Sequence, residues 1–342
     1  MDRMSDRSAE FEKMIAQRVE GTWPKVKIGG FAGGGLVSGG TFSFRGSTDG
    51  VGTKVDLLRR WGKLETIGWD AVAMAAQDVF MEGISPCASY DYIIVDELIP
   101  EYHIAVIDGV ISACFEAGCY LAGGETAEHR NVGLPGGFID IAGFCVGFEN
   151  DYFRLEPKKF VEPGMKLWGW LSHGIGSNGY TVVREILEKK FGFRLTDNPY
   201  ILPPRVAEEL SARDSYIAGS VEEALLKPTV IHIKNIKPFL EQECFVGLAH
   251  VTSGGMFRNI PRILPDNCAA RIERGSWGIP AIFELLQDWG GMSDLEMYNT
   301  FNMGIQVVGV SYEDIDEVDH SECVYIGEVV ERERANEPVS IV

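Results

Sequence analysis

Apolar positions recur along the chain with two different spacings, and these spacings predict where helices and strands form. Nearly every residue from Ile67 to Met81 is apolar, which predicts a buried helix that ends before Gly83 and Pro86. The segment 138–149 carries the longest strand pattern. Further strands are predicted near 42–44, 92–95, 119–126 (running into a glycine turn), 165–171, 244–250, 268–273, 303–310 and 324–331, and helices near 11–19, 101–118, 180–191, 228–243, 256–263, 280–289 and 312–318.

Both halves of the chain mix strands with long helices, which predicts an α+β fold. With 342 residues, the chain is longer than the roughly 250–300 residues that one hydrophobic core usually serves, so two domains are expected. The segment 156–166 contains two prolines and a run of charges, as domain linkers often do. We therefore predict an N-terminal domain at 1–163 and a C-terminal domain at 164–342.

The negative charge of the chain disfavours some classes of binding partner. The formal net charge is −19 and the isoelectric point is near 4.8, so nucleic acid and anionic membrane surfaces are not expected to bind. A phosphorylated ligand needs local help from backbone amides, a lysine or a divalent cation. Seven cysteines without a CxxC pair, a charged N-terminus and no long apolar run predict a reduced, cytoplasmic protein without a membrane span.

Two carboxylates interrupt the apolar helix predicted at 67–81. Asp70 and Asp78 are eight residues apart, which places them about 80° apart around a helix and so on one side of it. A buried carboxylate needs a partner, a metal ion or a proton. An ordinary helix end explains Gly83 and Pro86 but not Asp78, and a Mg²⁺ ligand explains it better.

The segment 29–40 has seven glycines in twelve positions, among them Gly33 and Gly34. One interpretation is a flap whose backbone amides wrap a triphosphate. A surface loop without function is an equally good interpretation, because the segment has neither Walker spacing nor a strand leading into G-x-G-x-x-G.

Two other glycine-containing turns carry charged residues. In STDGVGTKVD (47–56), Asp49 could bind a metal ion and Lys54 a phosphate, although a D-G hairpin turn is the common alternative. In GGETAE (123–128), Glu125 could be presented at the end of a strand, whereas a capping turn with Thr126 is the structural alternative.

The second half offers two candidate sites. Ser177 and Asn178 precede a predicted helix, where they could cap it or help to hold a substrate phosphate. His250 follows an apolar strand in AHVTSGG (249–255). A lone histidine is usually structural, but beside Thr252 and the glycines, it is a candidate ligand or acid–base group.

The motifs DGVGTK, GGETAE, AGFCVG, SNGY, KPT, AHVT, NIPRILP and MYNTFNMG occur in the order seen in one family. From about residue 28 to 330, the chain resembles the phosphoribosylformylglycinamidine cyclo-ligases, which are also called aminoimidazole ribonucleotide synthetases. The resemblance implies a homodimer of two-domain α+β subunits whose N-terminal sheets pair across the dimer axis. It also implies ATP-dependent ring closure of formylglycinamidine ribonucleotide, with Mg²⁺, in purine biosynthesis.

The resemblance also assigns roles to residues. It implies catalytic roles for His250, Lys54 and Asp78, and metal binding by Asp49, Asp78 and Glu125. The ATP contacts it implies are Gly33, Gly34, Asp49, Gly50, Thr53, Lys54, Gly124 and Glu125. The substrate contacts it implies are Ser177, Asn178, Thr252 and Gly254.

Some positions depart from the family pattern. They are Gln77, Ile84, Gly176 (where the family has His), Val230 and Ser253, and the N-terminal family motif is missing. Two alternatives therefore stay open. One is another ATP-using member of the superfamily that phosphorylates a different substrate, and the other is a non-catalytic nucleotide-binding paralogue. Retention of the predicted metal- and phosphate-binding set favours an enzyme; its members are Asp49, Lys54, Asp78, Glu125 and His250.

Overall fold

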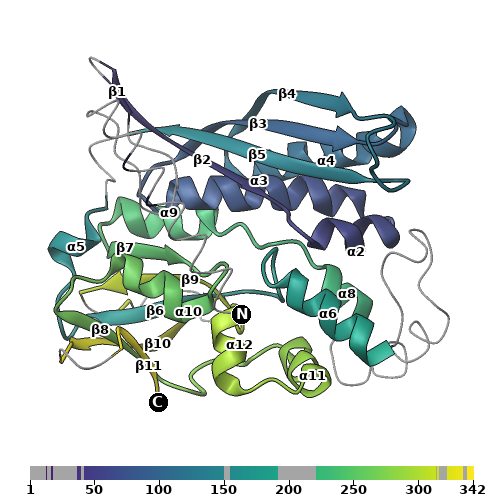
Figure 1. Cartoon of the computed structure of the whole chain (residues 1–342). Coiled ribbons are helices and arrows are strands. Elements are labelled where there is room, and N and C mark those ends of the chain that lie inside the picture. The colour runs from purple at the N-terminus through teal and green to yellow at the C-terminus, as the bar shows by residue number, and fades with distance from the viewer. Residues whose placement is uncertain are drawn as a thin grey trace.

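The computed structural model describes residues 37–39, 42–149, 155–191, 221–312, 314–315, 322–333 and 337–342, together with Lys13 and Gln17. These residues build two mixed β-sheets with helices between and around them (Figure 1). The first sheet has the order β1-β2-β5-β3-β4, from β1 (Val37–Gly39), β2 (Phe42–Gly50), β3 (Pro86–Val95), β4 (Tyr120–Glu128) and β5 (Ile139–Phe148). The second has the order β11-β8-β10-β6-β9-β7, from β6 (Lys166–Leu171), β7 (Phe245–His250), β8 (Cys268–Ile272), β9 (Ile305–Ser311), β10 (Cys323–Glu331) and β11 (Val339–Ile341).

The helices are distributed over both halves of the chain. They are α2 (Lys54–Arg60), α3 (Leu64–Phe80), α4 (Pro100–Ala117), α5 (Pro157–Phe160), α6 (Tyr180–Phe191), α8 (Val221–Leu226), α9 (Ile233–Glu241), α10 (Gly255–Asn259), the 3-10 helix η2 (Ile260–Ile263), α11 (Ala281–Gly290) and α12 (Asp294–Thr300).

Helices α3 and α4 form a layer that lies between the first sheet and the second half of the chain (Figure 1). The two helices approach closely because each has a glycine at the crossing. A Cβ added to Gly68 would lie 1.9 Å from the carbonyl oxygen of Val106, and one added to Gly109 would lie 1.8 Å from that of Glu65. This close packing fixes the position of α3, and α3 carries the carboxylates of the site.

The first sheet rests on α3 with one face and leaves the other face open. Along β5, buried and exposed residues alternate strictly from Ile139 to Cys145, as expected for a sheet with one covered face. Gly143 sits over the backbone of Ala71, where an added Cβ would lie 2.5 Å from the carbonyl oxygen. The strand that passes over α3 therefore accepts only glycine there.

Most predicted elements are confirmed. The apolar helix at 67–81 is α3, the helix at 101–118 is α4, and the strand at 138–149 is β5. The helix expected from residue 228 begins only at Ile233, and the glycines of GGETAE continue the strand β4 instead of forming a turn. Asp49 does not open a hairpin, since α2 follows. The helices predicted at 11–19 and 312–318 lie largely outside the described residues.

Among the described residues, no helix combines the length and the apolar character that crossing a membrane requires.

Candidate active site

The face of α3 that is turned toward the second half carries both predicted carboxylates, and each has a different partner. At the first, the Lys54 ammonium lies 2.6 Å from Asp70 Oδ2, and both side chains are completely buried. Lys54 also donates to the carbonyl oxygen of Lys227, and Asp70 Oδ1 accepts from the backbone N–H of Thr229. Burial lowers the pKa of Lys54 while Asp70 opposes that shift. This pair joins the two halves of the chain.

At the other end of α3, Asp78 meets His250, which is the last residue of β7. His250 Nδ1 lies 2.8 Å from Asp78 Oδ1. The histidine side chain is fully buried, whereas 16% of the Asp78 side chain is exposed. The histidine therefore stands behind the carboxylate, and only the carboxylate reaches the surface of the site.

Two glutamines fix the protonation of the His250 ring. Gln77 Oε1 accepts from the backbone N–H of His232, so the amide nitrogen of Gln77 faces His250 Nε2 at 3.4 Å. The amide nitrogen of Gln306, on β9, lies 2.8 Å from the same ring nitrogen. An amide nitrogen only donates, so Nε2 accepts, and Nδ1 carries the proton that it donates to Asp78.

Asp49, the last residue but one of β2, lies close enough to Asp78 for their negative charges to interact. Burial raises the pKa of Asp49 to about 6, and the nearby negative charge of Asp78 adds to the rise. The N–H of Gly50, which donates to Asp49 Oδ1 at 2.8 Å, opposes this rise. A cation placed between the two carboxylates would relieve the repulsion that Asp49 experiences.

This carboxylate pair fits a magnesium ion. Mg²⁺ is usually held by one or two protein carboxylates, with waters and substrate phosphates completing its shell. Within the described residues no cluster of three or more histidine, cysteine, aspartate or glutamate side chains has metal-binding geometry. Glu125 lies on β4, three strands from β2, or roughly 14 Å at the usual strand spacing. The structure thus brings Asp49 and Asp78 together and leaves Glu125 apart from them.

Glu125 and Gly124 line a separate hollow at the β4 edge of the first sheet. It has a volume of about 410 Å³ and is lined by Asp91, Ile107 and residues 121–126. Asp91 covers Gly124 so closely that an added Cβ would lie 2.6 Å from its carboxylate. Gly33 and Gly34, the two nucleotide contacts predicted in the flap at 29–40, lie outside the described part of the chain.

The predicted substrate residues of the second half border the carboxylate pair. Ser253 donates to Asn178 Oδ1 at 2.9 Å, and the Asn178 amide reaches Met74 of α3. Ser177 donates to the carbonyl oxygen of Val51, in the turn that follows Asp49. Gly254 precedes α10 with a φ of 88°, a conformation that favours glycine.

The remaining predicted residues have structural contacts. Thr252 approaches Asn259 Oδ1 at 3.5 Å, and the Asn259 amide in turn donates to backbone carbonyls of this loop. Thr53 lies 3.3 Å, oxygen to oxygen, from Thr181 of α6. The Thr252 contact is local to the loop before α10, whereas the Thr53 contact holds the turn after Asp49 against the second half of the chain.

Gly176 illustrates what the sequence missed. A Cβ at this position would lie 3.4 Å from Gln306 Oε1 and 3.7 Å from Thr229 Oγ1. The Gln306 side chain therefore lies against the place where a side chain at position 176 would begin. Nothing in the apolar strand pattern of 303–310 marked Gln306 as part of the site. Its role depends on His250, which lies more than fifty positions away in the chain.

Comparison with known proteins agrees with this architecture. Residues 40–148 match the model for the N-terminal domain of AIR synthase related proteins, and residues 162–339 match the model for the C-terminal domain. A solved thiamine monophosphate kinase from Aquifex aeolicus superposes with a TM-score of 0.57 at 16% identity, covering 90% of each chain. A hydrogenase maturation protein HypE in complex with ATP superposes with a TM-score of 0.59 at 15% identity, covering 95% of this chain and 88% of that one.

The fold and the two matched domain models define an AIR synthase-related protein of two α+β domains. Sequence relatives narrow this class. Phosphoribosylformylglycinamidine cyclo-ligase of Geobacter metallireducens is 38% identical over 356 residues, which cover 98% of this chain and 96% of the relative. That of Thermoanaerobacter sp. is 40% identical over 298 residues, which cover 84% and 82%. The chain belongs to the phosphoribosylformylglycinamidine cyclo-ligase family.

Proposed function

We propose that this protein closes the imidazole ring of aminoimidazole ribonucleotide, using formylglycinamidine ribonucleotide and ATP. The observation that carries the proposal is the meeting of Asp49, Asp78 and His250 where the two halves of the chain join, with Asn178 and Ser253 beside them. Family membership over nearly the full length of the Geobacter relative supports it.

The reaction requires one phosphoryl transfer and one ring closure. The γ-phosphoryl group of ATP passes to the formamide oxygen of the substrate, and ADP leaves. The amidine-side nitrogen then attacks the activated carbon, the carbon–oxygen bond breaks, and phosphate departs with both electrons of that bond. The attack is intramolecular, so holding the two ends of the substrate in register supplies much of the rate. Phosphoryl transfer likewise depends mainly on positioning and on charge stabilisation.

The residues of this chain divide that work. Asp49 and Asp78 would hold Mg²⁺, which neutralises phosphate charge when bound. His250 acts through Asp78, because its buried ring donates to that carboxylate and presents no free nitrogen to a ligand. It is therefore a positioning residue, supported from behind by Gln77 and Gln306. Asn178, Ser253 and Gly254 would border the ribonucleotide.

The remaining predicted contacts lie outside the proposed magnesium site. Lys54 is held in the buried pair with Asp70, so we assign it to joining the domains and not to the phosphates. Gly124 and Glu125 remain proposed nucleotide contacts in their own hollow. We also keep the domain boundary at residue 163 as a proposal, since one matched model ends at 148 and the next begins at 162.

The assay that tests the proposal mixes the protein with formylglycinamidine ribonucleotide, ATP and Mg²⁺, and measures aminoimidazole ribonucleotide by its diazo colour. We expect product and ADP in equal amounts, and no product when Mg²⁺ is chelated. ATP binding without product would instead favour the non-catalytic paralogue, the alternative that the departure at Gly176 kept open.

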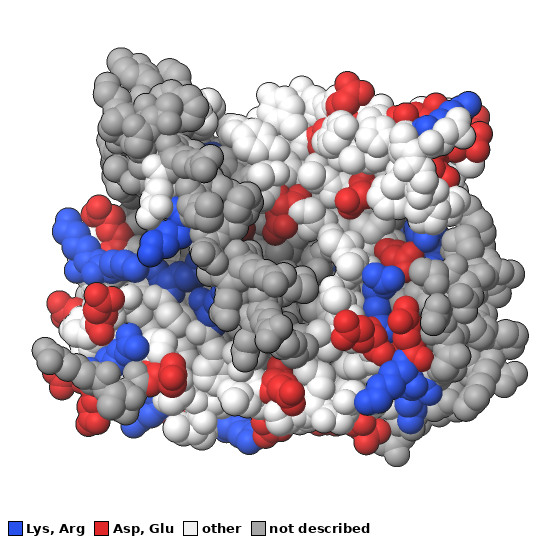
Figure 2. Space-filling model, viewed as in Figure 1, with Lys and Arg blue, Asp and Glu red and all other residues white. Residues whose placement is uncertain are grey.

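The open face of the first sheet supports the further proposal of a homodimer. It carries the aromatic side chains of Tyr90, Tyr92, Phe144 and Phe148, which are 40–56% exposed. Figure 2 shows the part of the molecule over β3 to β5 as mainly uncharged, although the chain as a whole is strongly acidic. An apolar face of this kind usually marks an interface. Sedimentation should give twice the 37.7 kDa chain mass, and a stable monomer at micromolar concentration would contradict the proposal.

A further inference from the structure

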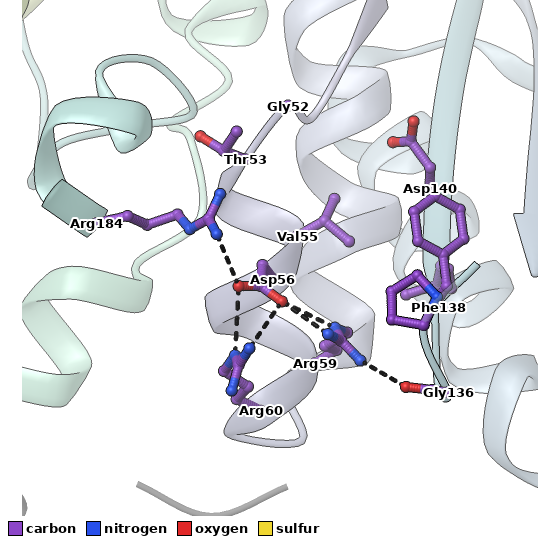
Figure 3. Close-up of a pocket in the computed structure, with 12 residues that line it drawn as sticks. Gly52, Thr53, Val55, Asp56, Arg59, Arg60, Gly136, Phe138, Asp140 and Arg184 are labelled. Atoms are coloured by element: carbon purple, nitrogen blue, oxygen red, sulfur yellow. Dashed lines mark hydrogen bonds and ion pairs between the residues drawn. The ribbon is translucent and has the colours of Figure 1, made fainter. Parts of the chain in front are cut away.

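A cavity of about 590 Å³ opens between α2, α6 and the segment that leads into β5 (Figure 3). This volume is typical of small-molecule sites. We call it the arginine pocket, and it is lined by Gly52, Thr53, Val55, Asp56, Arg59, Arg60, Pro135, Gly136, Phe138, Ile139, Asp140 and Arg184.

Three guanidinium groups in the arginine pocket surround the carboxylate of Asp56. Asp56 lies 2.8 Å from Arg59 Nη2, 3.3 Å from Arg60 Nε and 3.3 Å from Arg184 Nη2. Figure 3 shows the three side chains converging on Asp56, while the carboxylate of Asp140 points away from them. Three positive charges thus gather around this carboxylate, in a chain whose net charge is −19.

The clustered arginine side chains are partly desolvated, which makes their mutual repulsion costly. Only 5% of the Arg60 side chain is exposed. Burial lowers the pKa of Arg60, and repulsion from Arg59 and Arg184 adds to this, against the attraction of Asp56. The Nε of Arg184 is buried and has no hydrogen-bond partner among the residues that the structure describes. A dianion in the cavity would relieve the repulsion and could accept from guanidinium donors.

The shape of the pocket limits what such an anion is attached to. Val55, Phe138 and Ile139 form an apolar wall, and Figure 3 shows Thr53 near Arg184 at one end. Thr53 is four residues after Asp49, so their Cα atoms are at most about 14 Å apart. A sugar phosphate can span this distance, with its phosphate on the arginines and its other end toward Asp49.

We infer that the arginine pocket binds the phosphate group of a phosphate monoester. The inference rests on the proposed function in one respect, since the ribonucleotide substrate of that reaction carries a 5′-phosphate of this kind. A free sugar phosphate offers the same chemistry, and experiment separates the two sources.

The first measurement is calorimetric titration of ribose 5-phosphate into the full-length protein without nucleotide or Mg²⁺. Arg184→Met keeps a long aliphatic side chain and removes the guanidinium, so we expect affinity to fall about 10–100-fold, as for a lost charge-assisted hydrogen bond. Arg271→Met is the matched control, because it removes the same charge from an ion pair with Glu328 on the second sheet. It should leave the affinity unchanged, and ribose without phosphate should not bind.

A second variant has the opposite expected effect and does not depend on losing an arginine. Asp56→Asn removes the anion that competes for the three guanidinium groups, so ribose 5-phosphate should bind more tightly. Thermal unfolding establishes that each variant is folded before its affinity is compared. Absence of ribose 5-phosphate binding, an equal loss in Arg184→Met and Arg271→Met, or weaker binding by folded Asp56→Asn would each overturn the inference.

The source of the phosphate is decided by competition during turnover. If ribose 5-phosphate raises the KM for formylglycinamidine ribonucleotide, and Arg184→Met raises it too, the pocket holds the substrate's own phosphate. If ribose 5-phosphate binds through Arg184 without competing, the pocket holds a separate phosphate monoester. Because the calorimetric titration needs no turnover, it remains decisive if the proposed reaction itself fails.

Discussion

Two aspartates on one face of α3 have different roles. Asp70 and Asp78 both project from α3 toward the second half of the chain. Asp70 is completely buried and fully neutralised by Lys54. Asp78 receives only a neutral imidazole hydrogen bond, stays partly exposed and lies near a second carboxylate, Asp49.

The comparison shows how the burial and the partner of a carboxylate distinguish a structural role from a metal-binding role. A buried carboxylate that has a lysine partner has no charge left to offer a ligand, so it serves to join domains. A carboxylate whose partner is an uncharged donor keeps its negative charge, and a second carboxylate nearby makes the absence of a cation costly. Mutations at the two ends should therefore differ in kind: the first should change folding, and the second should change metal binding.

The largest expected effect is on stability, at the Asp70 end. Asp70→Asn leaves the Lys54 ammonium buried without a counter-charge, and removing one member of a buried pair typically costs about 3–5 kcal/mol. Urea unfolding measures the loss. The control is Glu116→Gln, which breaks an exposed pair with Lys234 across the same two halves and should cost less than about 1 kcal/mol. Similar losses for the two variants would contradict the structural role of Asp70.

At the Asp78 end, we expect little change in stability and a large change in metal dependence. ATP should bind poorly to the wild-type protein without Mg²⁺, because the chain is acidic, and Mg²⁺ should restore binding. Asp78→Asn removes a proposed ligand, so kcat/KM should fall by more than the roughly 10–100-fold typical of outer-shell groups. Calorimetry of ATP with and without Mg²⁺ measures the coupling. Equal ATP affinity in the two conditions for the wild-type protein would refute the magnesium site.

His250 should show a smaller effect of the same kind, because it acts on the ligand side only through Asp78. For His250→Ala, the Mg²⁺ concentration needed for half-maximal activity should rise about 10–100-fold. Activity should recover in part at high Mg²⁺. Gln306→Leu should also raise the Mg²⁺ concentration needed for half-maximal activity, because the substitution removes a donor that fixes the His250 ring. If kcat collapses at saturating Mg²⁺ while the metal affinity stays unchanged, the histidine acts directly on the substrate.

The sequence predicted the α+β halves, α3 and both of its carboxylates, because these depend on periodicity within a short segment. It did not predict which partner each carboxylate takes, since Lys54 and His250 lie 16 and 172 positions away in the chain and are brought in by tertiary structure. Lys54 followed a glycine turn and suggested a phosphate contact, but its long side chain turns inward to Asp70.

Some misses had a readable signal and others had none. Helix α12 has Ser293 at its N-cap and Glu296 three residues later, and the structure shows the reciprocal capping bonds that this pattern predicts. By contrast, the arginine pocket joins Arg59 and Arg60 of α2 to Arg184 of α6 through Asp56. No local pattern links residues so far apart, so only the folded chain reveals the cluster.

The smallest predicted effect tests a third contact on the same face of α3, one that carries no charge. The backbone N–H of His232 donates to Gln77, and the ring Nε2 donates to the carbonyl oxygen of Leu171 at 3.0 Å. Burial lowers the pKa of His232 to about 3, so the native ring stays neutral where an unfolded histidine, with a pKa near 6.5, takes up a proton. Because the unfolded state binds more protons between these values, stability should be lost as the pH falls below 6.5. The expected loss is about 2 kcal/mol at pH 5.

His232→Gln keeps a donor for Leu171 and should remove this loss, whereas His173→Gln, at an exposed ring near Glu322, should not. Urea unfolding at pH 7 and pH 5 measures the difference, and parallel pH dependence in wild type and His232→Gln would show that the buried ring is not the cause.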